Sequence, residues 1–412
     1  MYTILPTFLI VKYGARARAR RKPGRISSVP LCQPECTRAR GRPNPFRSMA
    51  SKLLVLFFVC ALAQYSVEIL EKGAEPALSI GKPAGQGYSP CKFTFNPAWI
   101  PAGPGLNASI LIVRASGCPD SFGGGSDHLL YAFCRIDDNG RGVCNDLLPY
   151  AFPFETEAED PRVFLLEENG ELWYYLYYFA SGPGQQTVYL RKTTTPLNLS
   201  SWQLVAKQLP WHRNGCVVVR ASGDHYVMFG ESPPLPGLGI ATTTDFSTYN
   251  YVNLTYMTPN GPNNTAEPEI VIEAGSTPIQ LSTGDYLHLY AAGTPGWVAN
   301  GNYTGGWIIM VRRLRGPPPA LLPPTQPTTH HPRFPAQDRD DPSILKQRSE
   351  THLFVPTMDY EIGGGKWPTN RFRTIFTTAV VPLPNEGADT FLVWYGAADA
   401  NVAWAKIRVT HS

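Results

Sequence analysis

The tetrapeptide Glu159-Asp160-Pro161-Arg162 has the residue types best suited to proton-transfer chemistry in this chain. Adjacent carboxyl groups before a proline, with an arginine beside them, suit a general acid held at the mouth of a strand. The run Val163–Glu167, which follows directly, has the composition of such a strand. The alternative is an Asx-type turn with a surface ion pair, which the same four residues also fit.

Short strands are the elements that must position such a group. From about residue 90 onward, apolar or aromatic runs alternate with turn residues, and no long stretch has a period of 3.6. The runs typical of strands are Ser109–Arg114, Leu129–Arg135, Leu172–Ala180, Gly215–Arg220, His225–Gly230, Glu269–Glu273, Asp285–Tyr290, Gly306–Val311, Thr374–Val381 and Thr390–Tyr395. This pattern predicts an all-β chain, and at this length it favours a propeller, because radial repetition leaves few open edges. No repeat between blades is visible in the sequence.

The charge of the chain is divided unevenly along its length. Residues 1–63 contain 12 of the 36 Lys and Arg but a single acid, Glu35. The remainder has 24 basic and 31 acidic residues, a net charge of −7, so the overall +4 indicates no nucleic-acid partner for the folded part. The 9 Trp, 20 Tyr and 19 Phe suit a β-rich core first and sugar stacking second.

Residues 49–63 have the form of a signal peptide. Lys52 precedes the apolar run Leu53–Ala63, which ends in a small-x-small cleavage pattern and is too short to span a bilayer. Residues 1–48 are rich in Arg and Pro, and we interpret them as a misplaced start ahead of Met49, with a transit peptide as the alternative. We therefore expect a single domain over residues 64–412, secreted or in the secretory pathway, with no membrane span in the mature chain.

Cysteines and glycosylation sequons agree with secretion. Cys134 and Cys144 flank the turn Asp137-Asp138-Asn139-Gly140, which predicts a hairpin-closing disulfide in a glycoprotein. Five cysteines follow the predicted cleavage point, so at least one thiol is left over, and Cys216 in its apolar run is expected to be buried and free. The sequons are at Asn107, Asn198, Asn253, Asn263 and Asn302. No cysteine or histidine spacing indicates a metal site, and no cofactor is expected.

A proline-rich segment at about residues 315–339 interrupts the strand pattern. It has few aliphatic residues and many prolines, beginning with Pro317-Pro318-Pro319. Such a composition cannot form a packed strand or helix. We interpret it as a disordered surface insertion or as translated intron, and a proline-rich recognition loop is the alternative.

An ordered series of short motifs accompanies the tetrapeptide. The members are Phe95-Asn96-Pro97-Ala98, Val113-Arg114-Ala115, Arg213-Asn214-Gly215, Tyr226-Val227-Met228, Gly275-Ser276-Thr277-Pro278-Ile279 with Gly284-Asp285-Tyr286-Leu287, Asp340-Asp341-Pro342-Ser343, Arg348-Ser349-Glu350, Asp359-Tyr360-Glu361 and Trp394-Tyr395-Gly396-Ala397-Ala398-Asp399. In this order the series resembles glycoside hydrolase family 130, the mannoside phosphorylases and hydrolases, over roughly residues 93–409. The resemblance implies a five-bladed β-propeller with its active site at one end of the central tunnel, and inversion of the anomeric centre.

The resemblance also implies roles for individual residues. Asp160 matches the family's catalytic acid, which protonates the glycosidic oxygen through a substrate hydroxyl. Positions that match sugar-binding residues are Asn96, Arg114, Arg162 and Asp399. Asn214 with Arg213 matches a pair close to the incoming nucleophile. The plainer alternatives are that Arg162 only neutralises a neighbouring carboxylate and that Asp399 caps a turn.

Two departures from the family pattern bear on the nucleophile. Family phosphorylases carry a basic residue just after the Tyr-x-Met strand, where this chain has Glu231, and a His where it has Ala291. A phosphate dianion needs a cationic pocket, so these departures favour water. An inverting hydrolase needs a second carboxylate as general base, about 6.5–9.5 Å from the acid. Glu231 is the first candidate and Glu273 the second, Glu267 and Glu269 are weaker candidates, and a solvated surface position is the alternative for each.

Three functions remain open at this point. We favour an inverting hydrolase of β-mannosidic linkages, with an oligosaccharide or glycan as substrate. A phosphorylase or mannosyltransferase would need Arg114, Arg162 and Arg213 to hold phosphate without the histidine. A sugar-binding propeller without catalysis is the third.

Overall fold

A computed structural model describes the chain from Gln64 onward. The described ranges are 64–80, 87–103, 106–149, 151–153, 155–182, 185–207, 213–220, 223–230, 237–260, 268–295, 302–312, 340–363 and 373–412. The predicted leader, signal peptide and proline-rich segment lie outside these residues, as does Glu231. Among the described residues, no helix is long and apolar enough to cross a membrane.

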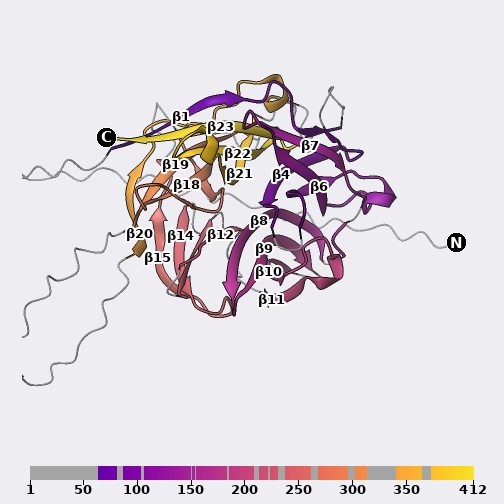
Figure 1. Ribbon diagram of the computed structural model, residues 1–412, viewed down its shortest axis with the longest axis horizontal. Helices are drawn as coiled ribbons and strands as arrows, with labels where there is room; N and C mark the ends of the chain where they lie inside the picture. Colours follow the sequence, from indigo (N-terminus) through magenta and orange to yellow (C-terminus); the bar gives the residue numbers. More distant parts are fainter. Residues whose placement is uncertain are drawn as a thin grey trace, which may run out of the picture. The chain divides into compact units, whose positions relative to one another are not determined.

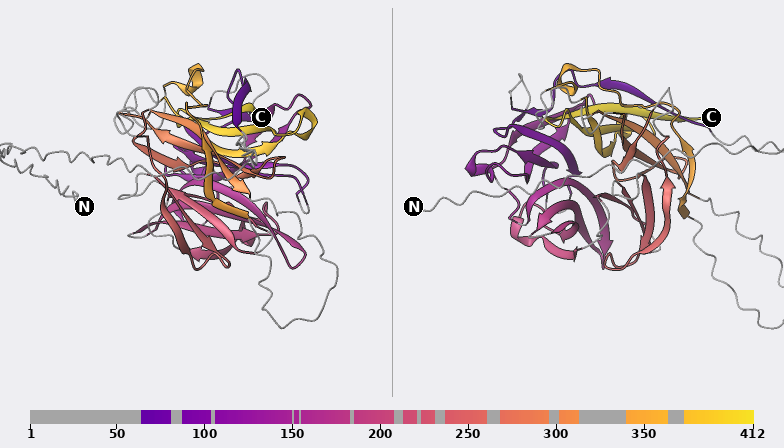
Figure 2. Two further views of the ribbon diagram at one scale, coloured as in Figure 1. Left: turned by 90° about the vertical axis from the view of Figure 1, so that its left-hand side faces the viewer. Right: turned by 180° about the vertical axis from the view of Figure 1, so that it is seen from behind.

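Five small sheets form a five-bladed β-propeller, and their strands pair antiparallel except for β2 and β3 (Figures 1 and 2). Blade 1 consists of β4 (Phe93–Ile100), β5 (Ile110–Ser116), β6 (His128–Ile136) and β7 (Gly142–Leu147). Blade 2 consists of β8 (Thr156–Glu168), β9 (Glu171–Gly182), β10 (Gln185–Thr193) and β11 (Gln203–Lys207). Blade 3 consists of β12 (Arg213–Val218), β13 (His225–Gly230), β14 (Leu238–Thr243) and β15 (Asn250–Met257). Blade 4 consists of β16 (Val271–Ala274), β18 (Tyr286–Gly293), β19 (Tyr303–Arg312) and β20 (Asp340–Arg348), with the short β17 (Ile279–Gln280) paired to β18.

Blade 5 joins the two ends of the described chain. Its strands are β21 (Ile375–Pro382), β22 (Thr390–Ala397) and β23 (Asn401–His411), and β1 (Tyr65–Lys72) pairs antiparallel with β23. Two short strands, β2 (Leu78–Ser79) and β3 (Gly87–Tyr88), extend the same sheet. The described helices are single 3₁₀ turns at Asp120–Phe122, Leu199–Ser201, Asp359–Glu361 and Pro384–Glu386.

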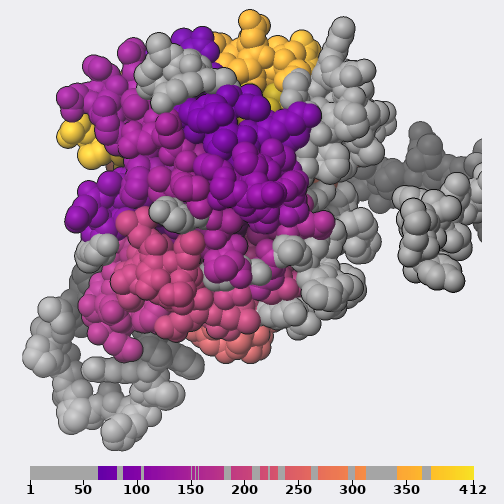
Figure 3. Space-filling view, turned by 90° about the vertical axis from the view of Figure 1, so that its right-hand side faces the viewer, coloured from indigo at the N-terminus to yellow at the C-terminus, as the bar shows by residue number. Residues whose placement is uncertain are grey.

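The hydrophobic core is divided into five clusters, one between each pair of neighbouring blades. Leu111 packs with Trp394 between blades 1 and 5, and Phe164 packs with Val227 between blades 2 and 3. A sheet covered on both faces buries every residue of its central strands, as β5, β18 and β22 do. The sequences of these central strands are therefore continuous apolar runs, without alternation of apolar and polar residues. Figure 3 shows the side of the molecule where atoms of blade 1, in indigo and purple, lie above atoms of blade 2, in magenta.

The strand and cysteine predictions are confirmed. All ten predicted runs overlap strands, and His225–Gly230 coincides with β13. Cys134 and Cys144 face one another across β6 and β7 and form a disulfide. A second disulfide joins Cys91, just before β4, to Cys118, just after β5. Cys216 is buried and free, and burial raises the pKa of its thiol to about 12.

Candidate active site

Three inner strands carry a polar residue at the same place, near the start of the strand. Asn96 in β4, Asp160 in β8 and Asn214 in β12 have φ of 47°, 51° and 55°, and each lies at a break in register. A bulge of this kind re-aims one side chain out of the ladder, and Asn and Asp tolerate left-handed backbone better than other residues with a Cβ. The bulges therefore direct three polar side chains toward one end of the propeller axis.

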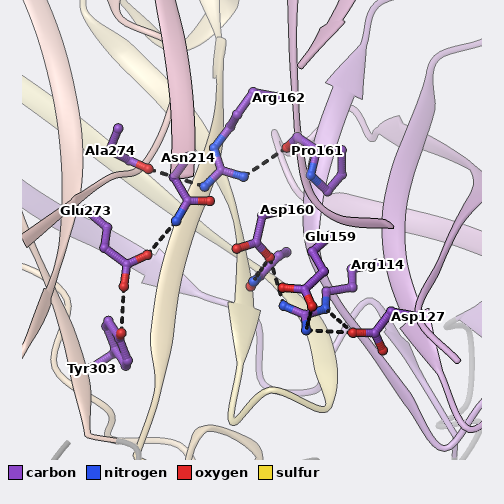
Figure 4. Close-up of polar contacts among 11 residues, drawn as sticks. Arg114, Asp127, Glu159, Asp160, Pro161, Arg162, Asn214, Glu273, Ala274 and Tyr303 are labelled. Atoms are coloured by element: carbon purple, nitrogen blue, oxygen red, sulfur yellow. Dashed lines mark hydrogen bonds and ion pairs between the residues drawn. The ribbon is translucent and has the colours of Figure 1, made fainter. Parts of the chain in front are cut away.

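Asp160 is the centre of a buried ionic cluster (Figure 4). Its Oδ1 accepts from Asn96 Nδ2 at 2.8 Å and from Arg114 Nη1 at 3.2 Å. Arg114 also contacts Glu159 Oε1 at 3.0 Å and donates through Nη2 to Asp127 Oδ2 at 2.7 Å. The side chain of Asp160 is 6% exposed, so the solvated surface ion pair considered for the tetrapeptide does not describe it. Residues of blades 1 and 2 thus meet at this carboxyl group.

Arg162 follows two residues later and is held by backbone rather than by carboxylates. It is 1% exposed and donates to the carbonyl oxygens of Gly275 at 2.5 Å, Pro161 at 2.9 Å and Ala274 at 3.3 Å. Burial lowers the pKa of its guanidinium, while the nearby carboxylates of Asp160 and Glu273 act in the opposite direction. These contacts tie β8 to the end of β16. A role for Arg162 in sugar binding stays a prediction.

Glu273, in β16 of blade 4, faces the same end of the axis. Its Oε2 accepts from Asn214 Nδ2 at 2.5 Å and its Oε1 from the Tyr303 hydroxyl at 2.6 Å. It is 3% exposed, so the solvated position considered as its alternative does not describe it. Figure 4 shows the guanidinium of Arg162 lying between the Asp160 cluster and the Glu273–Asn214 pair. The arrangement brings the predicted acid and the second candidate base to one place.

Two buried acceptor atoms near Asp160 and Glu273 have no hydrogen-bond partner. Asn96 and Asn214 each use their amide nitrogen on a carboxylate, and the Oδ1 atoms of both are buried without a hydrogen-bond partner. Leaving a buried acceptor unsatisfied costs about 1–3 kcal/mol. A ligand that presents hydroxyl donors would satisfy both atoms, as would an ordered water.

Two further predicted site residues, Asp399 and Arg213, are described mainly through their backbone. Asp399 has φ 49° in the turn between β22 and β23, where Ala400 accepts a backbone bond from Thr94 at the start of β4. That contact brings the turn to the end of the axis where Asn96 lies. The backbone of Arg213 pairs with Gly230, but its side chain is outside the described part of the structure.

Glu269, one of the weaker candidates for the general base, belongs to a separate network. Its carboxylate accepts from Tyr290 at 3.1 Å, His352 Nε2 at 3.1 Å and the Asn260 backbone at 2.9 Å, and it pairs with Arg348. Burial acts to raise its pKa, but the bonds from His352 and Arg348 outweigh it and lower the pKa. This many donors suit a structural carboxylate.

Sequence reasoning missed Asp127 and Tyr303. Asp127 follows the glycine-rich turn before β6, and Tyr303 stands inside the sequon at Asn302, so neither drew attention as a site residue. The sequence has no local signal for these two residues. It does have one for the rest of the site, because a pair of Asn or Asp followed by Pro or Gly recurs at 96–97, 160–161 and 214–215. This repeat marks the bulge of three successive inner strands.

A cavity of about 420 Å³ lies along the axis at the opposite end of the inner strands. Its lining includes Trp99, Leu165, Val219, Gln280 and Pro382, from near the ends of the inner strands of blades 1, 2, 3 and 5 and from the short β17 of blade 4. This lining is mainly apolar and contains none of the predicted site residues. Within the described ranges, no group of three or more His, Cys, Asp or Glu has a geometry that would hold a metal ion.

Comparison with known proteins supports the fold. No protein-family model matches the sequence, and no curated protein matches it either. Similar solved structures include the β-1,2-mannobiose phosphorylase from Listeria innocua, with TM-score 0.54 and 16% identity over 82% of this chain and 96% of that one. A glycosyl hydrolase from Bacteroides ovatus has a TM-score of 0.51 and 16% identity, over 83% of this chain and 93% of that one. A third structure, from work on family 130 of mannoside phosphorylases and its hydrolases that target β-1,2-mannosidic linkages in Candida mannan, gives TM-score 0.53 and 16% identity over 83% and 93%. At this identity the likeness is one of fold, and it confirms at that level the resemblance that the motif series predicts.

Proposed function

We propose that this chain is an inverting glycoside hydrolase of the family 130 type that acts on β-mannosidic linkages. The observation that carries the proposal is the hydrogen bond between Asn214 and Glu273. Asn214 is the residue that the motif series matches to the neighbourhood of the nucleophile. A carboxylate bound to it disfavours a phosphate dianion there and provides a base for water.

The charges of the described cluster also favour hydrolysis over phosphorolysis. Its carboxyl groups are Asp127, Glu159, Asp160 and Glu273, and its cations are Arg114 and Arg162. Both guanidinium groups are already engaged, one by carboxylates and the other by backbone carbonyls. Phosphorolysis would need these two groups, together with Arg213, to bind phosphate instead.

In the proposed reaction, Asp160 and Glu273 have opposite roles. Glu273 takes a proton from water, whose oxygen attacks the anomeric carbon on the face opposite the leaving sugar. The glycosidic bond breaks as its oxygen receives a proton that originates from Asp160, through a substrate hydroxyl. Among the described contacts, Asp127, Glu159 and Asp160 all bond to the guanidinium of Arg114.

The experiment is a comparison of products with and without phosphate. The chain from Gln64 onward is incubated with β-1,2- and β-1,4-mannobiose, beside Asp160→Asn and Glu273→Gln. We expect free mannose without phosphate, and a loss of roughly 10²–10⁴ in rate for each variant. Mannose 1-phosphate formed only with phosphate would establish the phosphorylase instead. No product from a folded protein would favour a sugar-binding propeller.

We also propose that the mature chain is secreted or stays in the secretory pathway. The support is the pair of disulfides in blade 1, Cys91–Cys118 and Cys134–Cys144, since such bonds persist in oxidising compartments.

A further inference from the structure

The outer strand of blade 3 exposes an unusual amount of apolar surface. In β15, Tyr251 is 48% exposed, Val252 49% and Leu254 46%. The strand pairs with β14 on one side and is the last strand in the described order of its sheet, at the periphery of the propeller in Figure 1. An exposed apolar edge strand is a template for pairing with another chain, and natural proteins cover or charge such edges.

A sequon lies within this exposed stretch. Asn253 and Thr255 are both exposed, and Asn253 Oδ1 accepts from the backbone N–H of Thr255 at 2.9 Å and from its hydroxyl at 3.3 Å. The acceptor amide and the hydroxyl that defines the sequon are thus adjacent and open to solvent. A glycan on Asn253 would be attached within the exposed apolar stretch, between Val252 and Leu254 in the sequence.

The sequon at Asn302 differs in each of these respects. Its Tyr303 donates to Glu273, and its Thr304 hydroxyl bonds to His352 Nδ1 at 2.8 Å. All three of its residues are half-buried. A glycan there would stand beside the proposed active site, whereas β15 is the outermost strand of its blade.

We propose that Asn253 is an N-glycosylation site whose glycan covers the exposed apolar edge of β15. The amide nitrogen of Asn253 would attack the anomeric carbon of a lipid diphosphate-linked oligosaccharide. A nitrogen–carbon bond forms, the carbon–oxygen bond to the diphosphate breaks, and the amide loses one proton as the lipid diphosphate leaves. The proposal rests on the proposed secretory location and not on the proposed hydrolysis.

The first test is expression of the full chain in eukaryotic secretory cells, followed by peptide mass spectrometry with and without an amidase that releases N-linked glycans. We expect Asn253 to be converted to Asp by the amidase, and Thr255→Ala to abolish this conversion while Thr255→Ser keeps it. An unmodified Asn253 in a chain whose blade 1 disulfides have formed would overturn the proposal. A chain whose blade 1 cysteines are reduced would also overturn the proposal, because such a chain has not entered the compartment where the glycan is transferred.

The second test concerns the role of the glycan. Light scattering on heating should show Asn253→Gln aggregating at a lower temperature than the glycosylated chain. Adding Leu254→Lys to Asn253→Gln should restore the original aggregation temperature, because a charge blocks edge pairing. Equal aggregation of all three proteins, or a stable dimer formed through β15, would show that a glycan is not what covers this edge.

Discussion

At the residue scale, the two proposed catalytic carboxyl groups differ in what holds them. Asp160 is bonded by an amide and a guanidinium, whereas Glu273 is bonded by the amide of Asn214 and the hydroxyl of Tyr303. Each oxygen of Glu273 accepts one of these bonds, so its orientation is fixed at both atoms. Tyr303 also packs edge-on against Phe376, at 5.9 Å between ring centroids, which restricts its own position.

Replacing Tyr303 by Phe tests whether this orientation matters for turnover. The variant keeps the ring packing and removes one hydrogen bond to a charged group, which typically contributes about 1.5–3 kcal/mol. If the bond positions Glu273 for attack by water, kcat should fall roughly tenfold or more while KM changes little. Steady-state hydrolysis of mannobiose, with a thermal melt of each protein, measures both effects.

Tyr290→Phe is the matched control. It removes a similar bond from a buried tyrosine to Glu269, in the network that we regard as structural. We expect Tyr290→Phe to lower stability and leave kcat unchanged. If both variants lower stability alike and neither affects kcat, Tyr303 does not position Glu273 for catalysis.

At the scale of the element, the bulged starts of the inner strands β4, β8 and β12 show which parts of the site could be predicted from the sequence. Individual strands and the Glu159–Arg162 tetrapeptide were recognisable because burial on both faces and a proline at a bulge leave local signals. The contacts between side chains could not be recognised in the sequence. Asn214 and Glu273, for example, come from different blades and meet only around the axis. Arg162 illustrates the same limit, since its three acceptors are backbone atoms that no side-chain pattern encodes.

The close approach of β22 to β4 supplies a prediction at this scale. A Cβ on Gly396 would lie 2.1 Å from Asn96 Oδ1 and 2.8 Å from its backbone nitrogen. Gly396→Ala should therefore displace the bulge of β4 and break the bond from Asn96 to Asp160. We expect kcat/KM to fall about tenfold or more, and stability to fall by about 1–3 kcal/mol.

The control for that substitution is Gly125→Ala. A Cβ on Gly125 meets nothing within 4 Å, so this variant should match the parent protein in both measurements. Unchanged activity in Gly396→Ala, with a normal melting temperature, would mean that the Asn96–Asp160 bond is not needed for catalysis.

At the scale of the whole molecule, the propeller is closed by its first strand. The chain after the predicted cleavage point enters β1, which pairs with β23 from the other end of the sequence and completes blade 5. Tyr65 extends the closure to blade 4, with its hydroxyl donating to Asp285 at 2.5 Å and its N–H to Gln347 at 2.8 Å. The sequence did not predict this strand, because its partner lies more than 300 residues away.

Removing β1 should therefore weaken the whole molecule and not one blade alone. A chain that starts at Gly73 loses the burial of Tyr65, Val67 and Ile69 against the core between blades 4 and 5, and it leaves β23 with an open edge. Burial of such side chains contributes about 1.5–3 kcal/mol each when complete, so we expect a loss of roughly 3 kcal/mol or more. Urea unfolding followed by tryptophan fluorescence would show a lower midpoint, whereas Leu70→Ser, at a 38% exposed position of the same strand, should change stability by less than about 0.5 kcal/mol. An unchanged midpoint for the shortened chain would mean that blades 1 to 5 hold together without the N-terminal strand, and that pairing of the two chain ends adds nothing to the stability of the ring.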